Sequence, residues 1–260
     1  MAAYCRNLSG TAGIVIYATL VSKYLFFEMG VFHFSRKDAS MDFKRILLLS
    51  GHYGSGKTNI ALNLAHLLRQ THERVTIADV DIVNPYFRTS DSRRELEDAG
   101  IRLICSEFAG SNVDLPALPA SIYAVTDDPT QAAIIDVGGD DRGALALGRL
   151  RDRILEENDY EMLLVINRFR PLTKTPELTV EVMREIEIAG GIPFTAVINN
   201  SNLGAETTPE DVLNSMAYAD EVCRLTGLPL KMTTVHESLY PQLFGKIDNL
   251  FPLGLQKKIQ

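Results

Sequence analysis

Residues 51–58, which read GHYGSGKT, constrain this chain more than any other part of it. They fit the phosphate-loop pattern G-x-x-x-x-G-K-[ST]. Residues 45–50 (RILLLS) are typical of a short buried strand, and residues 59–68 carry apolar side chains at helical spacing. Strand, glycine-rich loop and helix in this order turn successive backbone N–H groups toward one anion, and the helix N-terminus adds a partial positive charge. The sequence therefore predicts a nucleoside triphosphate site.

The loop residues share the expected work of binding a nucleotide. Glycines allow the backbone to curl around the phosphates. We expect Lys57 to reach the β- and γ-phosphates and to stabilise charge on the transferred phosphoryl group, and Thr58 to hold Mg²⁺. The predicted nucleotide-binding residues of the loop are Gly51, Gly54, Ser55, Gly56, Lys57 and Thr58.

The net charge limits the kinds of partner that we expect, and the cysteine pattern indicates the cellular compartment. A formal net charge of −7 over 260 residues argues against a broad basic surface, so we expect no nucleic-acid partner. Cys5, Cys105 and Cys223 lie far apart without C-x-x-C spacing, which predicts neither a zinc site nor a disulfide framework. A reduced, cytoplasmic compartment fits this pattern best.

Residues 1–40 differ in character from the rest. Residues 12–34 are apolar and aromatic, but charged residues interrupt them, and the uninterrupted run 12–22 is too short to span a bilayer. Translation beginning at Met41, a cytoplasmic or peripheral extension, and a membrane anchor are the three interpretations. We favour the first, because the codons just before Met41 can contain the core of a bacterial ribosome-binding site. The expected parts are an N-terminal extension, 1–40, and a P-loop nucleotide-binding domain, 41–260.

In the second part, short apolar strands alternate with amphipathic helices. This order predicts one α/β domain with a mostly parallel sheet of about seven strands and helices on both faces. After the first strand, the expected strands are 74–79, 101–106, 132–137, 162–167, 194–200 and 228–235. Expected helices include 93–99, 143–158, one that ends at 190–191, and one that Thr208 and Pro209 open. An amphipathic segment, 240–251, is expected to pack on the sheet rather than to bind a membrane.

Acidic residues stand at the ends of two expected strands, where parallel α/β sheets place their ligand chemistry. Asp136 precedes VGGDD, and we expect it to act through a water of the Mg²⁺ shell. Asp79 and Asp81 are spaced i, i+2 and point the same way. We assign Asp79 to the metal shell and Asp81 to orienting the attacking water, the alternative being that one of them caps a turn. The predicted metal residues are thus Thr58, Asp79 and Asp136, and the catalytic residues are Lys57 and Asp81.

Two further groups follow later strands. Asn199 and Asn200 end the sixth strand, and an amide offers the donor and the acceptor that suit an adenine edge, although asparagines in turns are common without function. We include Asn199 among the nucleotide-binding residues. No Asn-Lys-x-Asp signature follows this strand, which favours ATP over GTP. Residues 168–170 (RFR), after the fifth strand, are candidates for lining a second substrate pocket.

The order of these motifs resembles that of the MinD/ParA/CobQ–CobB group of P-loop ATPases. Residues 78–88 and 136–141 are similar to a poorly characterised bacterial subgroup that is usually described only as ATP-binding. The likeness covers most of residues 41–235. It implies a SIMIBI-like P-loop fold, ATP and Mg²⁺ as ligands, and a nucleotide-dependent homodimer. Many of these ATPases have a lysine at the position of His52, which crosses the dimer interface to the partner's phosphates, and a glycine at the position of Tyr53.

Three functions follow from these patterns. The first is a Mg²⁺-dependent ATPase that acts as a slow nucleotide switch for an unidentified protein partner. The second is an ATP-dependent small-molecule kinase or ligase on the same fold, which would depend on a metabolite. The third is a non-catalytic nucleotide-binding module, which would bind ATP tightly and hydrolyse it very slowly.

Overall fold

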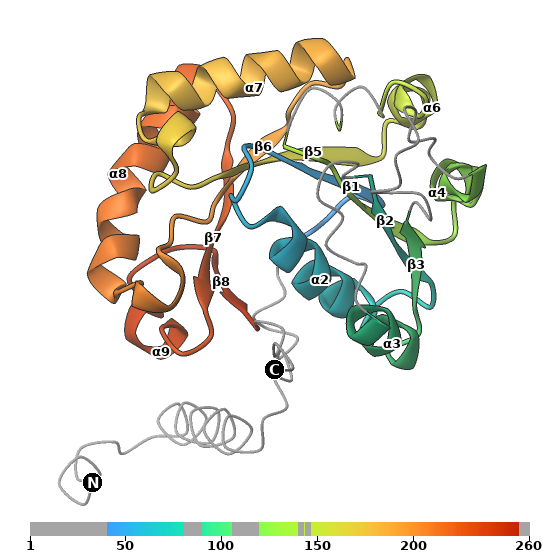
Figure 1. The fold of residues 1–260 in the computed structure, drawn as a ribbon, viewed down its shortest axis with the longest axis horizontal. Helices are drawn as coiled ribbons and strands as arrows, with labels where there is room; N and C mark the ends of the chain where they lie inside the picture. Colours follow the sequence, from blue (N-terminus) through green and yellow to red (C-terminus); the bar gives the residue numbers. More distant parts are fainter. Residues whose placement is uncertain (1–40, 81–89, 106–119, 140–142, 144–146, 255–260) are drawn as a thin grey trace, which may run out of the picture. The chain divides into compact units, whose positions relative to one another are not determined.

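The computed structural model describes residues 41–80, 90–105, 120–139, 143 and 147–254. The chain divides into two units, Met1–Asp42 and Phe43–Gln260. All the helices and strands named below belong to the second unit (Figure 1).

The described residues form one eight-stranded sheet in which every pair of neighbouring strands is parallel. The strand order is β3-β2-β4-β1-β5-β6-β7-β8, so β1 lies between β4 and β5. The strands are β1 (Ile46–Ser50), β2 (Val75–Asp79), β3 (Ile101–Cys105), β4 (Ala132–Asp136), β5 (Tyr160–Ile166), β6 (Ala196–Asn199), β7 (Leu230–His236) and β8 (Leu250–Leu253). Since all strands run the same way, their carboxyl ends meet at one edge of the sheet.

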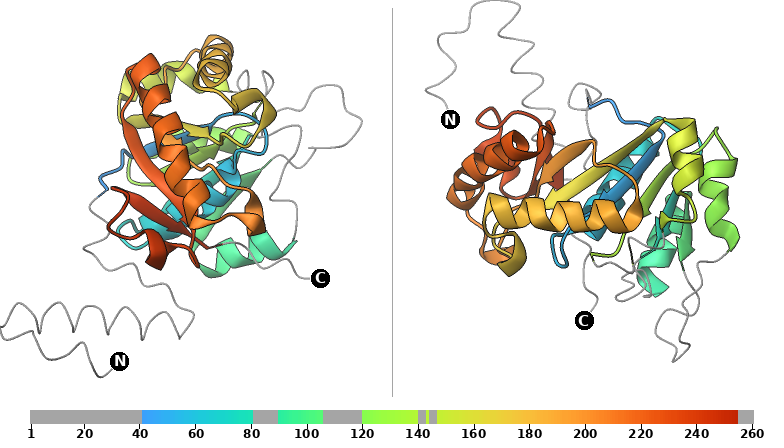
Figure 2. Two further views of the ribbon diagram at one scale, coloured as in Figure 1. Left: turned by 90° about the vertical axis from the view of Figure 1, so that its left-hand side faces the viewer. Right: turned by 90° about the horizontal axis from the view of Figure 1, so that it is seen from above.

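Helices cover both faces of this sheet (Figures 1 and 2). The α-helices are α2 (Lys57–Leu68), α3 (Ser90–Asp98), α4 (Ala124–Asp127), α6 (Arg151–Glu157), α7 (Pro176–Gly190), α8 (Pro209–Thr226) and α9 (Tyr240–Leu243). Short 3₁₀ helices are η2 (Ala120–Tyr123), η3 (Pro171–Thr173) and η4 (Gly204–Glu206). The predicted α/β fold class with helices on both faces is confirmed.

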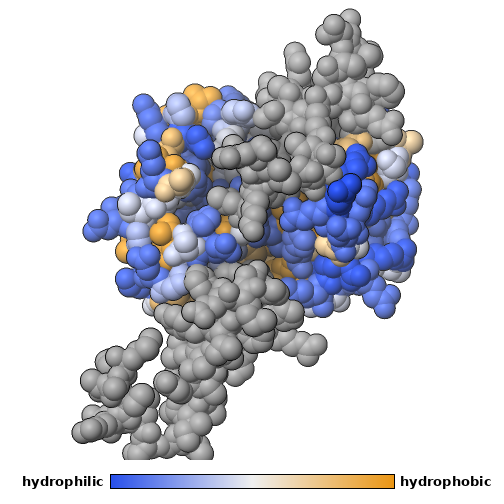
Figure 3. All heavy atoms as spheres, turned by 60° about the horizontal axis from the view of Figure 1, so that its bottom comes forward, coloured by the Kyte–Doolittle hydropathy of each residue, from blue (hydrophilic) through white to orange (hydrophobic). Residues whose placement is uncertain are grey.

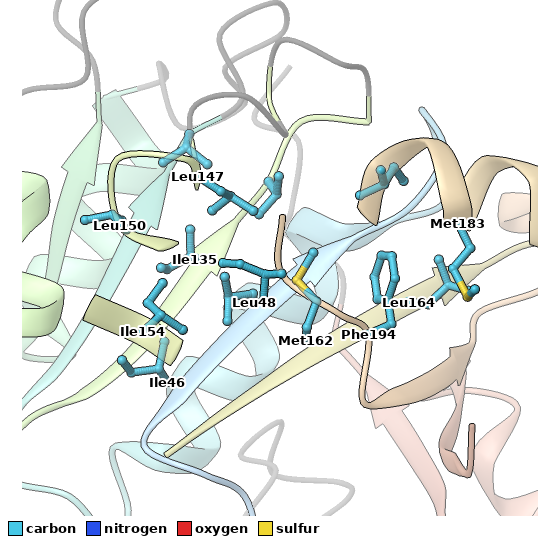
Figure 4. Packing of buried hydrophobic residues seen from close by; sticks show 14 of the residues in the cluster. Ile46, Leu48, Ile135, Leu147, Leu150, Ile154, Met162, Leu164, Met183 and Phe194 are labelled. Atoms are coloured by element: carbon cyan, nitrogen blue, oxygen red, sulfur yellow. The ribbon is translucent and has the colours of Figure 1, made fainter. Parts of the chain in front are cut away.

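The central strand β1 shows why two helical layers are needed. Ile46 and Leu48 belong to a buried cluster that includes side chains of α4, α6, α7 and α8 (Figure 4). Leu47 and Leu49 are just as completely buried. Because side chains alternate along a strand, these two point to the opposite face, where α2 packs. Burial on both faces explains the uninterrupted apolar run of this strand.

The helix boundaries follow the local signals in the sequence. Thr208 forms a reciprocal capping box with Asp211, and Pro209 occupies the first turn of α8. The helix ends at Gly227, whose φ of 74° lies in the left-handed region that glycine favours. The predicted start and end of this helix are confirmed.

The last described segment differs from the expectation of one amphipathic helix over 240–251. Only Tyr240–Leu243 is helical, and residues 250–253 form the edge strand β8. Gly245 and Asn249 have φ values of 78° and 52°, so the backbone turns between the two elements. Proline in β8 is compatible with an edge strand, where one N–H needs no ladder partner. The expected packing is confirmed, since Leu243, Ile247 and Phe251 are buried.

The helix expected over 143–158 is interrupted in the structure, where residues 143 and 147 are helical but residues 148–150 are not. Residues 148–150 form a turn before α6 begins at Arg151, and residues 144–146 lie outside the described part.

Among the described residues, no helix is both long enough and apolar enough to cross a membrane. The described surface in Figure 3 is mainly hydrophilic, with apolar residues scattered among polar ones.

Candidate functional site

The predicted strand, loop and helix around residues 51–58 are confirmed. β1 ends at Ser50, and α2 begins at Lys57 directly after the loop. Gly51, Gly54 and Gly56 all have positive φ values, of 142°, 72° and 94°. A methyl group on Gly56 would lie 2.2 Å from the side-chain nitrogen of Asn200, so a larger residue fits neither the backbone nor the space. The loop therefore has the curled backbone that phosphate binding requires.

Lys57 is held inside the loop. Its Nζ donates to the carbonyl oxygen of Gly51 at 3.0 Å and lies 3.4 Å from that of His52. The residue is buried, with 7% of its surface exposed. The ammonium thus lies against the first half of the loop, and the lysine at this position of the motif is the one that reaches the β- and γ-phosphates.

The three predicted metal residues lie at the same edge of the sheet. Thr58 Oγ1 donates to Asp136 Oδ2 at 2.5 Å, which joins the first turn of α2 to the end of β4. Asp79 ends the neighbouring strand β2 and stands in register with Asp136. Both aspartates are buried, and Asp136 is also the register partner of Leu49 in β1.

This donor set fits Mg²⁺. Carboxylate and hydroxyl oxygens are the ligands that this ion prefers, and it commonly takes only one or two carboxylates together with water and substrate phosphates. Within the described ranges, no three His, Cys, Asp or Glu side chains gather to hold a metal by themselves. Thr58, Asp79 and Asp136 would therefore need phosphate oxygens and water to complete the shell.

The segment after β4 lies directly on the phosphate loop. A methyl group on Gly139 would lie 2.6 Å from the backbone nitrogen of Tyr53 and 2.9 Å from the carbonyl oxygen of Gly51. Only a glycine allows this approach between the two backbones. The segment after β4 and the phosphate loop therefore pack backbone against backbone.

Asn200 ties the loop to the far strands. Its Nδ2 donates to the carbonyl oxygen of Ser55 at 2.6 Å, and its Oδ1 accepts from Thr234 Oγ1 of β7 at 2.7 Å. The side chain is buried, so both bonds are made away from water. Asn200 was not among the predicted binding residues. Alternation along a strand predicts that adjacent residues point to opposite sides, but it does not say which of the two asparagines faces the loop.

Asn199, which was predicted to bind the nucleotide, is occupied by protein groups. It is fully buried, and its Nδ2 donates to Ser215 Oγ in α8 at 2.9 Å. Its Oδ1 accepts from the backbone nitrogen of Ser201 at 3.2 Å. The base contact of Asn199 stays a prediction, and the structure brings its neighbour Asn200 to the loop instead.

The two arginines after β5 have different neighbours. Arg170 Nε donates to the carbonyl oxygen of Gly54 at 2.8 Å. Arg168 Nη1 donates to the carbonyl oxygen of Asn214 in α8 at 2.7 Å. Only Arg170 thus contacts the phosphate loop, although the sequence grouped both as candidates for one pocket.

His52 lies close to two cations. Burial of the imidazole lowers the pKa of His52 from its ordinary value of 6.5, and the positive charges of Lys57 and Arg170 lower it further. Its protonated fraction at pH 7 is therefore smaller than that of a free histidine. The imidazole of His52 is therefore mainly neutral at pH 7. Many of the ATPases that this chain resembles have a lysine at this position.

A family comparison agrees with this geometry. The model of the CobQ/CobB/MinD/ParA nucleotide-binding domain matches residues 46–213, well over half of the chain. The chain belongs to this family. The match begins at the first residue of β1 and includes the phosphate loop, Asp79, Asp136, Arg170 and Asn200. The protein is therefore a nucleotide-binding P-loop NTPase, and the resemblance seen in its motifs is confirmed.

Solved structures share the fold at low sequence identity. FtsY of Thermotoga maritima has a TM-score of 0.52 and 18% identity, covering 88% of this chain and 77% of its own. Chloroplast FtsY of Physcomitrella patens has a TM-score of 0.52 and 17% identity, covering 93% of this chain and 72% of its own. None of the curated protein sequences that were compared matches the chain.

One predicted catalytic residue of this CobQ/CobB/MinD/ParA-family chain lies outside the described residues. Asp81 follows Val80, the last described residue after β2, so its role stays a prediction. The acids at 140 and 141 lie outside them as well. Val80 itself continues the ladder, since its backbone nitrogen donates to the carbonyl oxygen of Asp136 at 2.9 Å.

Proposed function

We propose that this protein binds ATP with Mg²⁺, hydrolyses it slowly, and uses the nucleotide as a switch that controls an unidentified protein partner. The observation that carries the proposal is the hydrogen bond from Thr58 to Asp136 beside a formed phosphate loop. It places a hydroxyl and a carboxylate together where a cation would bridge to the phosphates. A nucleotide-binding fold alone would not require this pair.

Each residue then has a defined task. The backbone N–H groups of the loop bind the phosphates, and Lys57 exchanges its carbonyl partners for oxygens of the β- and γ-phosphates. Thr58 and Asp136, with Asp79 through water, would hold Mg²⁺, which when bound neutralises charge between the β- and γ-phosphates. Asp81 is proposed to orient the attacking water.

The switch is proposed for the segment after β4. Gly139 lies against the backbone of Tyr53 and Gly51, on the half of the loop where the γ-phosphate arrives. A γ-phosphate bound there would alter the contact between Gly139 and the loop. When hydrolysis removes this phosphate, the segment after β4 would be released. A surface that forms and disappears in this way can bind a protein partner in one nucleotide state only.

ATP is proposed over GTP, and a nucleotide-dependent homodimer is proposed as one form of the switch. Residues 200–203 after β6 read NSNL, without the Asn-Lys-x-Asp signature that would favour guanine. In such a dimer the mainly neutral His52 would contribute less positive charge to the partner's phosphates than a lysine does.

We also propose that the protein acts in the cytoplasm, where ATP is available.

The test is nucleotide turnover by the full chain, with molar mass measured by light scattering in each nucleotide state. We expect Mg²⁺-dependent hydrolysis of ATP in preference to GTP, with turnover lost in Lys57→Ala and Asp81→Ala and an ATP-dependent rise in mass. Hydrolysis that requires an added metabolite would favour a kinase or ligase. Tight ATP binding without turnover would favour a non-catalytic module, and no nucleotide binding would refute the proposal.

A further inference from the structure

Arg170 is held at the rim of the phosphate loop by a short, well-anchored segment. Its backbone nitrogen donates to the carbonyl oxygen of Asn167 at 3.1 Å, and its carbonyl oxygen accepts from the backbone nitrogen of Thr173 at 3.1 Å. Thr173 Oγ1 donates to the carbonyl oxygen of Asn167 at 2.7 Å. Thr173 and Asn167 are both buried. The backbone of Arg170 is therefore fixed, while its side chain extends over the loop.

A second set of bonds fixes this segment relative to the strands. Asn167 Nδ2 donates to the carbonyl oxygen of Asn202 at 3.2 Å, and the backbone nitrogen of Asn202 donates back to Asn167 Oδ1 at 3.3 Å. Asn200, two residues before Asn202, holds the carbonyl oxygen of Ser55. The segments after β5 and β6 and the phosphate loop thus form one connected polar network.

The guanidinium is oriented by one of its three nitrogens only. Nε donates to the carbonyl oxygen of Gly54, and the guanidinium carbon would lie 3.4 Å from a methyl group on that glycine. Within the described ranges, Nη1 and Nη2 donate no hydrogen bond to protein, and no carboxylate forms an ion pair with Arg170. Two donors in a fixed planar fork are thus left for an anion, and phosphate oxygens match their spacing.

The surroundings indicate which phosphate. Lys57 Nζ lies against the carbonyl oxygens of Gly51 and His52, the half of the loop that faces the β- and γ-phosphates. Arg170 contacts Gly54 in the same half of the loop, and its positive charge lowers the pKa of His52. A permanent cation beside a mainly neutral histidine supplies positive charge at the end of the triphosphate.

We infer that Arg170 is a second cation of the nucleotide site, which binds the terminal phosphate of the bound triphosphate through Nη1 and Nη2 while Nε stays on Gly54. The inference rests on the proposed function, because it requires a bound triphosphate. In many of the similar ATPases a lysine at the position of His52 brings positive charge to the phosphates of the partner subunit. In this protein Arg170 would bring that charge to the phosphates bound by its own chain.

The test compares affinities of the full chain for a non-hydrolysable ATP analogue and for ADP, with Mg²⁺, by titration. We expect Arg170→Ala to weaken binding of the ATP analogue about 10- to 100-fold while ADP affinity changes less than about threefold, because ADP lacks the phosphate concerned. Arg170→Lys keeps the charge but loses the fork, so part of the lost affinity returns. Arg168→Ala is the matched control and leaves both affinities unchanged, since Arg168 bonds to Asn214 instead.

The outcomes separate this inference from the proposed function. If wild-type protein binds neither nucleotide, the proposed function fails and the inference fails with it. If wild-type protein binds both and Arg170→Ala weakens both equally, or neither, only the inference is overturned. Retained ADP affinity shows in the same experiment that the variant is folded.

Discussion

On the side of β2 and β4 the phosphate loop meets carboxylates, Asp79 and Asp136, whereas on the side of β5 and β6 it meets amides and an arginine. The first side contacts the hydroxyl of Thr58, the group that we propose to hold Mg²⁺. The second side contacts backbone carbonyl oxygens, those of Gly54 and Ser55, which shape the loop itself. The difference fits the proposed function if the two sides divide the work: the acidic side would serve the chemistry, and the amide side would hold the loop in its binding shape.

Lys57 lies buried inside the loop that both sides contact, so its removal has the largest expected effect. We expect Lys57→Ala to lower ATP turnover about 100- to 1000-fold, because the charge that develops on the phosphoryl group loses its nearest fixed cation. Steady-state phosphate release measures this. Lys174→Ala, a change at the exposed C-cap of η3, is the control and should keep wild-type turnover.

Asp136→Asn tests the acidic side alone. The change is nearly isosteric and removes only the charge, so we expect turnover to fall about 100-fold while ADP affinity without Mg²⁺ stays unchanged. The thermal midpoint should not drop, because a buried negative charge has been removed. Unchanged turnover would contradict the assignment of the chemistry to the acidic side.

Asn200→Ala tests the amide side. It leaves the Ser55 carbonyl and the Thr234 hydroxyl without their partner, so we expect a loss of about 1–3 kcal/mol in unfolding free energy. ATP and ADP affinities should fall together, about tenfold, because the loop that binds both is loosened. Chemical denaturation and nucleotide titration measure the two effects. A selective effect on turnover would contradict the assignment.

Asn199→Ala is the companion variant and tests the predicted base contact. The structure has this side chain bonded to Ser215 and Ser201, so we expect lower stability with unchanged ATP affinity. A selective loss of ATP affinity over that for a triphosphate with another base would instead support the contact of Asn199 with adenine.

The smallest expected effect is a pH dependence from His52. Its pKa is lowered in the folded state, so between that pKa and 6.5 the unfolded chain binds more protons than the folded one. Stability should therefore be fully present above pH 6.5 and decline as the pH falls through this window. Comparing thermal midpoints of wild type and His52→Gln at pH 5.5 and 7.5 measures the effect, which the variant should reduce.

The sequence was sufficient for features that are local or set by topology. The phosphate loop is a contiguous motif, and β1 and α2 were recognisable from their apolar patterns. Asp79 and Asp136 could be placed together because parallel strands end at one edge. All three are consequences of spacing along the chain or of one rule about sheets.

Contacts between distant loops could not be predicted in this way. Asn200 reaches Ser55 across 145 positions, and Arg170 reaches Gly54 across 116. Which of two adjacent asparagines faces the loop depends on the register of β6 in the folded sheet. The edge strand β8 was missed because its four residues, including Pro252, carry a weak strand signal after a helical pattern.

The most direct test of the central claim is a calorimetric titration of the full chain with ATP, once with Mg²⁺ and once with EDTA, for wild type and Asp136→Asn. The account predicts that Mg²⁺ tightens ATP binding to wild type by about tenfold or more, and that this gain disappears in the variant while binding in EDTA is retained. ATP binding to wild type that does not respond to Mg²⁺, or no ATP binding at all, would contradict the account.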